Sequence, residues 1–275
     1  MGLDGIVAIG WRAAALLSRP QPVARVLAPL SASIYIGVDG EILWLGGPAD
    51  VMHPRAVLLS EPPDPAGLTA DDAISLPPCG VSAWRPEALV EGADVAAALR
   101  RGAARLAQTA LELGEPQGFG ARLADRVLQF PLAGAGRFAD TLAEACAADD
   151  ASAAAEAALA LLGLGTGLTP SGDDFVGGAF FARATLGRLG GSDSASWGQA
   201  AAGVRAAARG ATHPISAALL GDLVDGHGWS PLHDLTRALA AGDDAAATNA
   251  AQRLVRLGHS SGWDLLAGFV AGCAR

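Results

Sequence analysis

The sequence predicts an α+β protein, with a small β-rich domain of barrel or sandwich type at residues 1–88 and a larger all-α domain at residues 89–275. Runs rich in β-branched and aromatic residues, separated by turn signals, fill the first part. Eight of the 16 prolines fall between residues 48 and 86 and punctuate these runs. After Pro86 the chain is rich in alanine, with helical periodicity broken by glycine and proline. The change of texture near residue 88 therefore marks the predicted domain boundary.

The β-rich part contains one hairpin signal and several short strand candidates. Asp39-Gly40 lies between two β-rich runs, and this dipeptide favours a tight turn between antiparallel strands. Residues 6–18 fit a short helix or a strand that ends before Pro20. The strands expected from these patterns are 32–36, 42–45, 56–59 and 73–76.

The helical part divides at its glycines and prolines. Pro214 and Pro231 are placed where the first residue of a helix is expected, because proline's missing N–H is not needed there. The alanine-rich run 153–162 leads directly into a glycine-rich stretch. The expected helices are 87–112, 120–130, 138–162, 172–189, 197–210, 214–225, 231–241, 243–257 and 261–274.

The charge of the chain limits its partners. The 275 residues carry a formal net charge of −9, and every one of the 19 basic residues is arginine. An acidic chain without a basic stripe does not fit nucleic-acid binding or an anionic membrane surface. Since there is no lysine, a Schiff-base lysine, a P-loop lysine and a Ser-Lys dyad are excluded. Arginine, backbone N–H groups or a metal must hold any bound anion.

The cysteines and the apolar runs indicate a cytoplasmic protein. Cys79, Cys146 and Cys273 are widely spaced and form neither a metal-binding pattern nor a disulfide framework. The apolar N-terminal runs are interrupted by Trp11-Arg12 and lack a cleavage site typical of a signal peptide. No uninterrupted apolar run is long enough to span a bilayer. Abundant alanine helices are also compatible with self-association.

The stretch 163–174 is the strongest candidate site. Glycines at alternate positions precede Thr169-Pro170, expected as the N-cap and first residue of a buried helix. A glycine-rich loop that enters a helix N-terminus presents unpaired N–H groups and a positive dipole end to an anion. The alternative is a tight turn between helices, for which fewer glycines are sufficient. The residues expected to contact a bound anion here are Gly165, Gly167, Thr169, Ser171, Gly172 and Asp173.

An internal echo of this motif suggests a second half of the site. Residues 171–178 and 261–268 both read Ser-Gly-x-Asp, two apolar residues, any residue, then Gly. Two such helix N-termini facing one cleft would form an anion pocket. The alternative is coincidence between two Ala-, Gly- and Ser-rich helices. The residues expected to contribute from the second copy are Ser260, Ser261 and Gly262.

Three residues are the candidates for catalysis: Asp174, His259 and Asp264. Neighbours on a helix point about 100° apart, so Asp173 and Asp174 cannot both face one ligand. Asp174 is preferred because Asp264 is its counterpart, whereas capping and dipole compensation explain Asp173. The two carboxylates would orient the reacting groups or share a Mg²⁺ ion, although two carboxylates alone do not complete a metal site. His259 would bind an oxyanion or act as a general acid.

These motifs resemble those of the AllH-like proteins, a family once described only as a domain of unknown function. The resemblance rests on the glycine-rich stretch 163–175 and on 258–264, and more loosely on His53-Pro54 and on the segment 212–220. One member of the family is a subunit of oxamate carbamoyltransferase. The resemblance implies a place in purine and allantoin nitrogen catabolism, where oxalurate and phosphate become oxamate and carbamoyl phosphate. It also implies an assembly with other kinds of subunit, and it brings no assigned catalytic residues.

Two other functions stay open at this point. One is a Mg²⁺-dependent hydrolase on a helical scaffold that uses Asp173, Asp174 and Asp264. The other is a non-catalytic subunit whose glycine loops dock a partner. The sequence leaves open whether the isolated chain is an enzyme. The ligand expected for a carbamoyltransferase subunit is a small carboxylate or phosphate anion.

Overall fold

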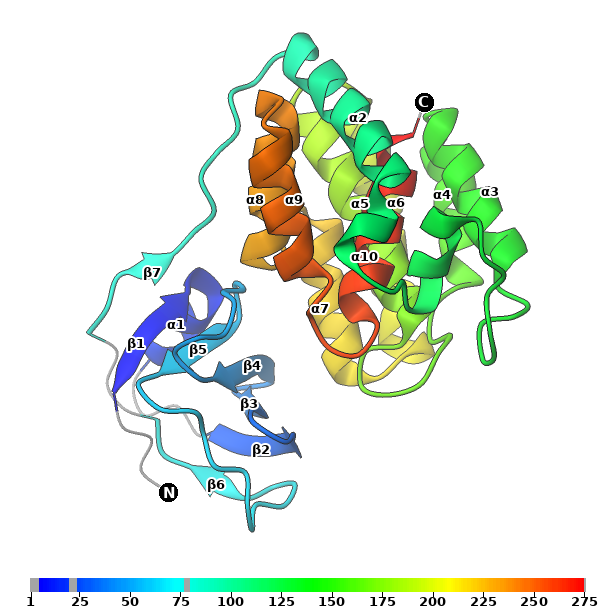
Figure 1. Ribbon diagram of the computed structural model, residues 1–275. Helices are drawn as coiled ribbons and strands as arrows, with labels where there is room; N and C mark the ends of the chain where they lie inside the picture. Colours follow the sequence, from blue (N-terminus) through cyan, green and yellow to red (C-terminus); the bar gives the residue numbers. More distant parts are fainter. Residues whose placement is uncertain (1–4, 20–23, 77–79, 275) are drawn as a thin grey trace. The chain divides into compact units, whose positions relative to one another are not determined.

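The computed structural model describes residues 5–19, 24–76 and 80–274. The chain divides into two compact units, residues 1–87 and 88–275. The first contains a mixed β-sheet and the second is helical (Figure 1). The predicted α+β class is confirmed. Cys79 lies outside the described residues.

The first unit is built on one seven-stranded sheet with the strand order β6-β2-β3-β4-β5-β1-β7. The Asp39-Gly40 turn joins β3 to β4 as an antiparallel hairpin, with Asp39 at a φ of 50° and Gly40 at 82°. β4 and β5 run parallel, as do β1 and β7, and the other pairs are antiparallel. The strand order is linear, so the described strands form one mixed sheet. A barrel or sandwich was the expectation for this unit. The elements are β1 (Ile6–Gly10), α1 (Trp11–Leu17), β2 (Ala24–Pro29), β3 (Ile34–Val38), β4 (Glu41–Gly46), β5 (Ala56–Leu59), β6 (Ala73–Ile74) and β7 (Ala83–Trp84).

The second unit follows most of the expected helices. Pro214 lies at the start of α7 and Pro231 in the first turn of α8, as predicted. The elements are α2 (Ala93–Gln108), η1 (Ala110–Leu113), η2 (Gly118–Ala124), α3 (Gly136–Ala147), α4 (Ala151–Leu159), α5 (Ser171–Arg188), α6 (Ser194–Ala211), α7 (Pro214–Val224), α8 (Ser230–Ala241), α9 (Asp244–Leu254) and α10 (Ser261–Cys273), of which η1 and η2 are 3₁₀ helices.

Three predicted helices were wrong in extent. The helix 138–162 is two helices, because Asp149 adopts a φ of 57° and Asp150 then caps α4 by accepting a hydrogen bond from the Ala153 N–H. The helix 120–130 is the 3₁₀ helix η2, which ends at Asp125 in the left-handed region. The helix 87–112 begins only after Gly92 and ends at Gln108, followed by η1.

The helical unit contains an internal repeat longer than the sequence echo. Asp150 caps α4 and Asp243 caps α9, each accepting from the backbone N–H three residues later. Gly172 in α5 and Gly262 in α10 each donate a hydrogen bond to a carbonyl of the preceding turn. α3 packs against α4 as α8 packs against α9. The helices α3, α4 and α5 are thus repeated as α8, α9 and α10.

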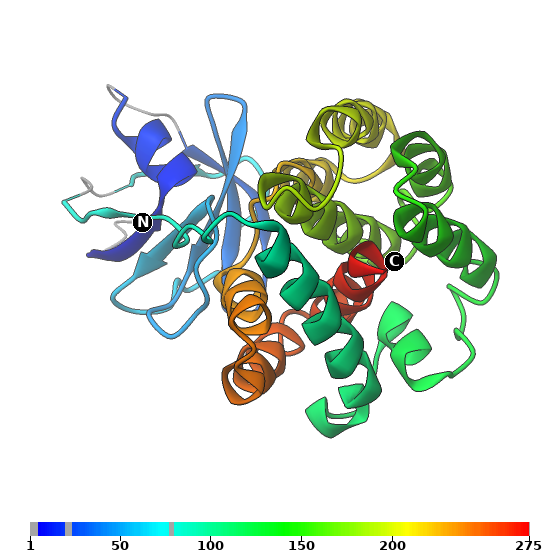
Figure 2. The ribbon, with the colours of Figure 1, turned by 90° about the horizontal axis from the view of Figure 1, so that it is seen from above.

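The two halves of this unit are interlocked. α2 precedes the first triplet but packs against α8 and α10 of the second, whereas α6 precedes the second triplet and packs against α4 and α5 of the first. η2 packs on α10 and α7 on α5 in the same crossed way. In Figure 2, α10 (red) lies among the other helices of its unit. Among the described residues, no helix has the length and apolar character needed to cross a membrane.

Candidate functional site

The loop before α5 needs its glycines. Gly163, Gly165 and Gly167 have φ angles of 74°, 121° and 91°, which side chains rarely adopt. The helix begins at Ser171, which is one residue after Pro170, expected as its first residue, and one residue before the expected range 172–189. The Thr169 hydroxyl does not cap this helix, so that prediction was wrong. It is instead 3.1 Å from the Ser261 hydroxyl at the start of α10.

The first turns of α5 and α10 are built alike. A Cβ on Gly172 would lie 2.0 Å from the Leu161 carbonyl oxygen, and one on Gly262 would lie 1.9 Å from that of Leu254. Both values are far below a van der Waals contact, so each helix start is pressed onto the end of the preceding helix. Only glycine fits at this position of the Ser-Gly-x-Asp motif.

The helices α5 and α10 run parallel and cross closely at two further glycines. A Cβ on Gly178 would be 2.2 Å from the Leu265 carbonyl oxygen, and one on Gly268 would be 1.9 Å from that of Phe175. Gly178 and Gly268 occupy the same place in the two copies of the motif, as do Phe175 and Leu265. The pair therefore has an approximate two-fold relationship, with both N-termini at the same end.

Four hydroxyl groups join the two helix starts. Thr169 contacts Ser261, and the Ser171 hydroxyl lies 3.3 Å from that of Ser260. The predicted pairing of the two motifs is thus present, but the starts touch each other directly. A ligand would lie on this hydroxyl layer, or displace part of it, to meet both helix ends.

Asp174 and Asp264 lie buried beneath the hydroxyl layer. Asp174 is 7% exposed and Asp264 is fully buried. The Phe119 N–H of η2 donates to Asp264 Oδ1 at 2.6 Å. The Oδ2 atoms of both carboxyls are buried without a hydrogen-bond partner among the described residues. Burying a charged oxygen without a hydrogen-bond donor costs free energy, so burial favours protonation of these carboxyl groups.

The burial of this pair changes its protonation. Burial raises the pKa of Asp174 well above its usual range, and the nearby Asp264 carboxylate raises it further. Burial also raises the pKa of Asp264 to about 7, although the Phe119 N–H and the hydroxyls of Ser171 and Ser260 lower it. Both carboxyl groups therefore hold a proton more readily than an exposed aspartate does, and for Asp264 the pKa of about 7 is close to neutral pH.

Asp173 has a different role from its neighbour. It is buried, and its carboxylate accepts from the Gly163 N–H at 2.8 Å, from the Ser216 hydroxyl at 2.6 Å and from the Thr212 hydroxyl. These bonds tie the glycine loop to the start of α7. Asp173 thus holds the glycine loop in place through three hydrogen bonds. This structural role goes beyond the dipole compensation expected from the sequence.

The two histidines near the motifs lie apart from the carboxyl pair. His259 is exposed in the turn before α10, and no described residue links it to Asp174 or Asp264. His213 caps α7 by accepting from the Ile215 N–H at 3.2 Å. Neither histidine is hydrogen-bonded to the carboxyl pair among the described residues.

The site provides hydrogen-bond donors and lacks a metal cluster. The backbone N–H groups of Thr166 to Thr169 make no hydrogen bond within the part of the chain that is described. The N-termini of the two parallel helices add their positive dipole ends on the same side. No group of three or more His, Cys, Asp or Glu residues that could hold a metal occurs in residues 5–19, 24–76 and 80–274.

Sequence reasoning missed the contribution of η2. Gly118 has a φ of 52°, and a Cβ there would meet Asp264 Oδ1 at 2.2 Å. A Cβ on Gly120 would meet Trp263 at 2.8 Å. The Gly118-Phe119-Gly120 tripeptide was visible, but nothing in its pattern indicated that it lies against the second Ser-Gly-x-Asp motif.

The fold and the site define a duplicated helical domain in which two equivalent helix N-termini meet over a buried carboxyl pair. The family model described as oxamate carbamoyltransferase subunit AllH matches residues 161–273. This segment includes both motifs, and the predicted resemblance is confirmed over it. No curated protein and no solved structure matched the chain when compared.

Proposed function

We propose that this chain acts as a subunit of a carbamoyltransferase of the oxamate type and binds a small carboxylate or phosphate at the joined starts of α5 and α10. The observation that carries the proposal is the parallel convergence of the two helix N-termini, both within the segment that matches the family model. An anion placed there meets two positive dipole ends and the N–H groups of Thr166 to Thr169. In a chain without lysine, these groups are a suitable substitute for a cationic side chain.

The reaction that the family description suggests needs a proton to be moved. When a phosphate oxygen attacks the carbamoyl carbon of oxalurate, the bond from that carbon to the oxamate nitrogen breaks. The nitrogen then takes up a proton, and the phosphate hydroxyl loses one. Asp264, whose pKa is about 7, is the group that gives or accepts this proton, through the hydroxyls of Ser171 and Ser260. The raised pKa of Asp174 favours its protonated form, which limits the negative charge beside Asp264.

The word subunit in the family description implies further chains, so we propose a hetero-oligomer in which a partner completes the site. Thr166, Gly167 and His259 are exposed and lie within three residues in sequence of Thr169 or Ser260, and we propose them as the surface that such a partner would meet. From this surface, His259 binds an oxyanion or acts as a general acid. We place the assembly in the cytoplasm, in purine and allantoin nitrogen catabolism.

A second candidate is a subunit that only holds its partner in place. It is favoured by the direct contact between the four hydroxyls, which leaves the two helix starts touching. A Mg²⁺-dependent hydrolase has less support, because Asp173 is committed to Gly163, Thr212 and Ser216 and does not join Asp174 and Asp264. Only the first candidate predicts anion binding by the isolated chain.

The test measures thermal unfolding and calorimetric titration with phosphate, oxamate and carbamoyl phosphate. A ligand at about 100 times its Kd stabilises the folded chain by roughly 2.7 kcal/mol. We expect at least one of the three to bind, and Ser171→Ala together with Ser261→Ala to weaken it by about tenfold or more. Ser230→Ala, at the start of α8, is the matched control and leaves binding unchanged. If none of the three anions binds, the chain does not bind a substrate by itself and the holding role is favoured.

A further inference from the structure

A cavity lies in the helical unit, away from the joined helix starts. It has a volume of about 360 Å³ and is lined by α5, α6 and the end of α7. Volumes of this size are typical of small-molecule sites. Arg183 in its wall is 12 residues beyond Ser171 on the same helix, which corresponds to about 18 Å along the axis. The cavity is therefore separate from the site proposed above.

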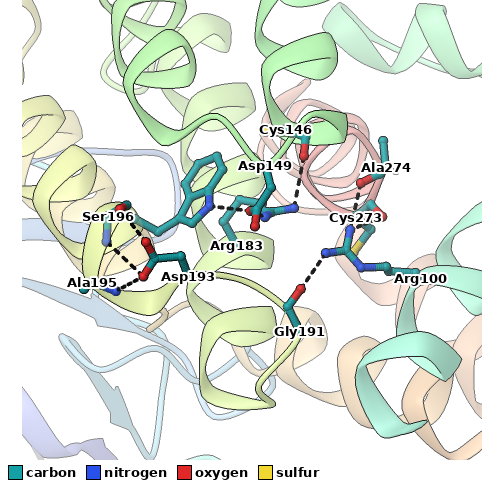
Figure 3. A network of polar contacts seen from close by, with 11 residues as sticks. Arg100, Cys146, Asp149, Arg183, Gly191, Asp193, Ala195, Ser196, Cys273 and Ala274 are labelled. Carbon is teal, nitrogen blue, oxygen red and sulfur yellow. Dashed lines mark hydrogen bonds and ion pairs between the residues drawn. The ribbon is translucent and has the colours of Figure 1, made fainter. Parts of the chain in front are cut away.

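Arg183 is a fully buried cation in this wall. Its Nη1 donates to the Cys146 carbonyl at 3.1 Å and its Nη2 pairs with Asp149 (Figure 3). Its guanidinium carbon lies 4.4 Å from the ring centroid of Trp197. The Nε atom is buried without a hydrogen-bond acceptor among the described residues. An unsatisfied buried donor on a charged group costs free energy unless an acceptor is supplied.

Arg188 provides a second guanidinium one and a half turns further along α5. Its Nη2 donates to the Thr185 hydroxyl at 3.3 Å and to the Gly226 carbonyl at 3.2 Å. No carboxylate pairs with it in the described part of the chain. The carboxylate of Asp225, also in the wall, is bonded to Arg205 at 2.5 Å. Donors of Arg188 thus stay available to a ligand.

The remaining wall is apolar and narrow. Phe180, Trp197, Ala201 and Val224 supply most of it, and Gly198 leaves open space, since a Cβ there would meet nothing within 4 Å. A ligand that fits has an apolar body for this wall and an anionic head for the two guanidiniums. Planar carboxylates match the guanidinium fork.

We propose that the cavity between α5 and α6 is a second binding site, for a small organic carboxylate with an apolar body. The carboxylate accepts hydrogen bonds from Arg188 and lies against the wall that holds the buried positive charge of Arg183. The apolar body packs against Phe180, Val224 and the edge of Trp197. The site takes no part in the chemistry at the joined helix starts, so its ligand is an effector.

The test uses benzoate as the probe and benzamide as its neutral isostere, with the full chain. Titration calorimetry and ligand-observed NMR should show benzoate binding at least tenfold tighter than benzamide. Arg188→Gln should remove this preference, whereas Arg209→Gln, an exposed arginine near the end of α6, should keep it. If benzoate and benzamide bind equally, the cavity is only apolar and the proposal fails.

A steric variant keeps the proposal testable without touching a charge. Gly198→Leu places a side chain in the open space of the cavity and should abolish benzoate binding. Gly203→Leu lies on the same helix, is exposed and has equally open space, but does not line the cavity. It should bind benzoate as the unmodified chain does. Benzoate binding that survives Gly198→Leu would overturn the assignment, as would the absence of binding to the unmodified chain.

Discussion

The two Ser-Gly-x-Asp copies share their framework and differ in what surrounds it. Gly172 and Gly262 approach the preceding helix equally closely, and Gly178 and Gly268 approach the partner helix equally closely. Six residues lie between Leu164 and Ser171, whereas three lie between the equivalent Leu257 and Ser261. The first copy thus carries three additional loop residues.

The copies also differ in the residue before the shared aspartate. Asp173 occupies this place in the first copy and accepts three hydrogen bonds from the loop and α7. Trp263 occupies it in the second copy and packs in the apolar core. In each copy the shared framework positions one aspartate of the carboxyl pair. The first copy alone adds a loop whose N–H groups make no hydrogen bond among the described residues. Framework and ligand contact can therefore be perturbed separately.

The largest expected effect is on the shared framework. Gly178→Ala and Gly268→Ala each place a Cβ about 2 Å from a backbone oxygen of the partner helix, so α5 and α10 must separate. Overpacking of this kind costs about 1–3 kcal/mol and occasionally more. Urea unfolding should show a loss of more than about 2 kcal/mol for both variants. Gly203→Ala, with open space around it, should gain up to about 1 kcal/mol of helix propensity. Unequal losses would show that the two copies are not equivalent.

The next effect separates Asp173 from Asp174. Asp173→Ala leaves the Gly163 N–H and two hydroxyls without their buried acceptor, and we expect a loss of about 2–4 kcal/mol. Asp174→Asn keeps the shape of a buried carboxyl whose raised pKa favours the neutral form, and we expect a change within about 1 kcal/mol. Denaturant unfolding at pH 7 measures both. A larger loss for Asp174→Asn would contradict the assignment of the structural role to Asp173.

A pH titration tests the buried pair. Because the folded pKa of Asp264 is about 7, well above the usual 3.8, the folded state holds this proton more tightly than the unfolded state. Its contribution to stability is complete below about pH 4 and is lost as the pH rises to 7. The loss is at most about 1.4 kcal/mol per pH unit. The difference in unfolding free energy between the natural chain and Asp264→Asn should fall over this range. A flat difference would show that Asp264 ionises normally.

The smallest effect on stability is expected from the loop itself. Deleting Thr166, Gly167 and Leu168 gives the first copy the spacing of the second. The exposed residues Thr166 and Gly167 contribute little to the core, and shortening a loop changes its closure entropy only slightly. We expect a change of about 1 kcal/mol or less, with loss of the stabilisation by the anion identified above. Retained anion stabilisation would move the binding site from the loop to the hydroxyl layer.

The parts of this molecule that depend on local pattern were predictable. The α+β class, the Asp39-Gly40 hairpin and most helices follow from turn residues and periodicity, and the pairing of the two motifs followed from their shared letters. The break at Asp149 was not predicted, because a left-handed aspartate inside an alanine-rich run leaves no signal in the pattern. Thr169 was assigned to a cap since the sequence gives no means of seeing that its hydroxyl is used by Ser261.

The candidate site depended more on tertiary contacts than the fold did. The identity of Asp174 and Asp264 as a pair was readable from the repeat, but their orphaned oxygens and raised pKa values arise from burial under residues distant in sequence. The role of Asp173 required Thr212 and Ser216, about 40 residues away. Contacts of this kind are set by the packing of α7 and η2, which periodicity does not encode.

The crossed packing of α2 and α6 has a consequence for how this unit folds. Each triplet of helices is completed by a helix that belongs to the other half of the chain. Arg100 in α2 strengthens this exchange, donating to the Ala274 carbonyl at 2.8 Å and to the Gly191 carbonyl at 3.0 Å (Figure 3). Residues 161–273 alone would leave α10 without α2 and η2, and so with its apolar face uncovered. The repeat is therefore not a pair of independent modules but one cooperative unit, whose motifs become ordered together.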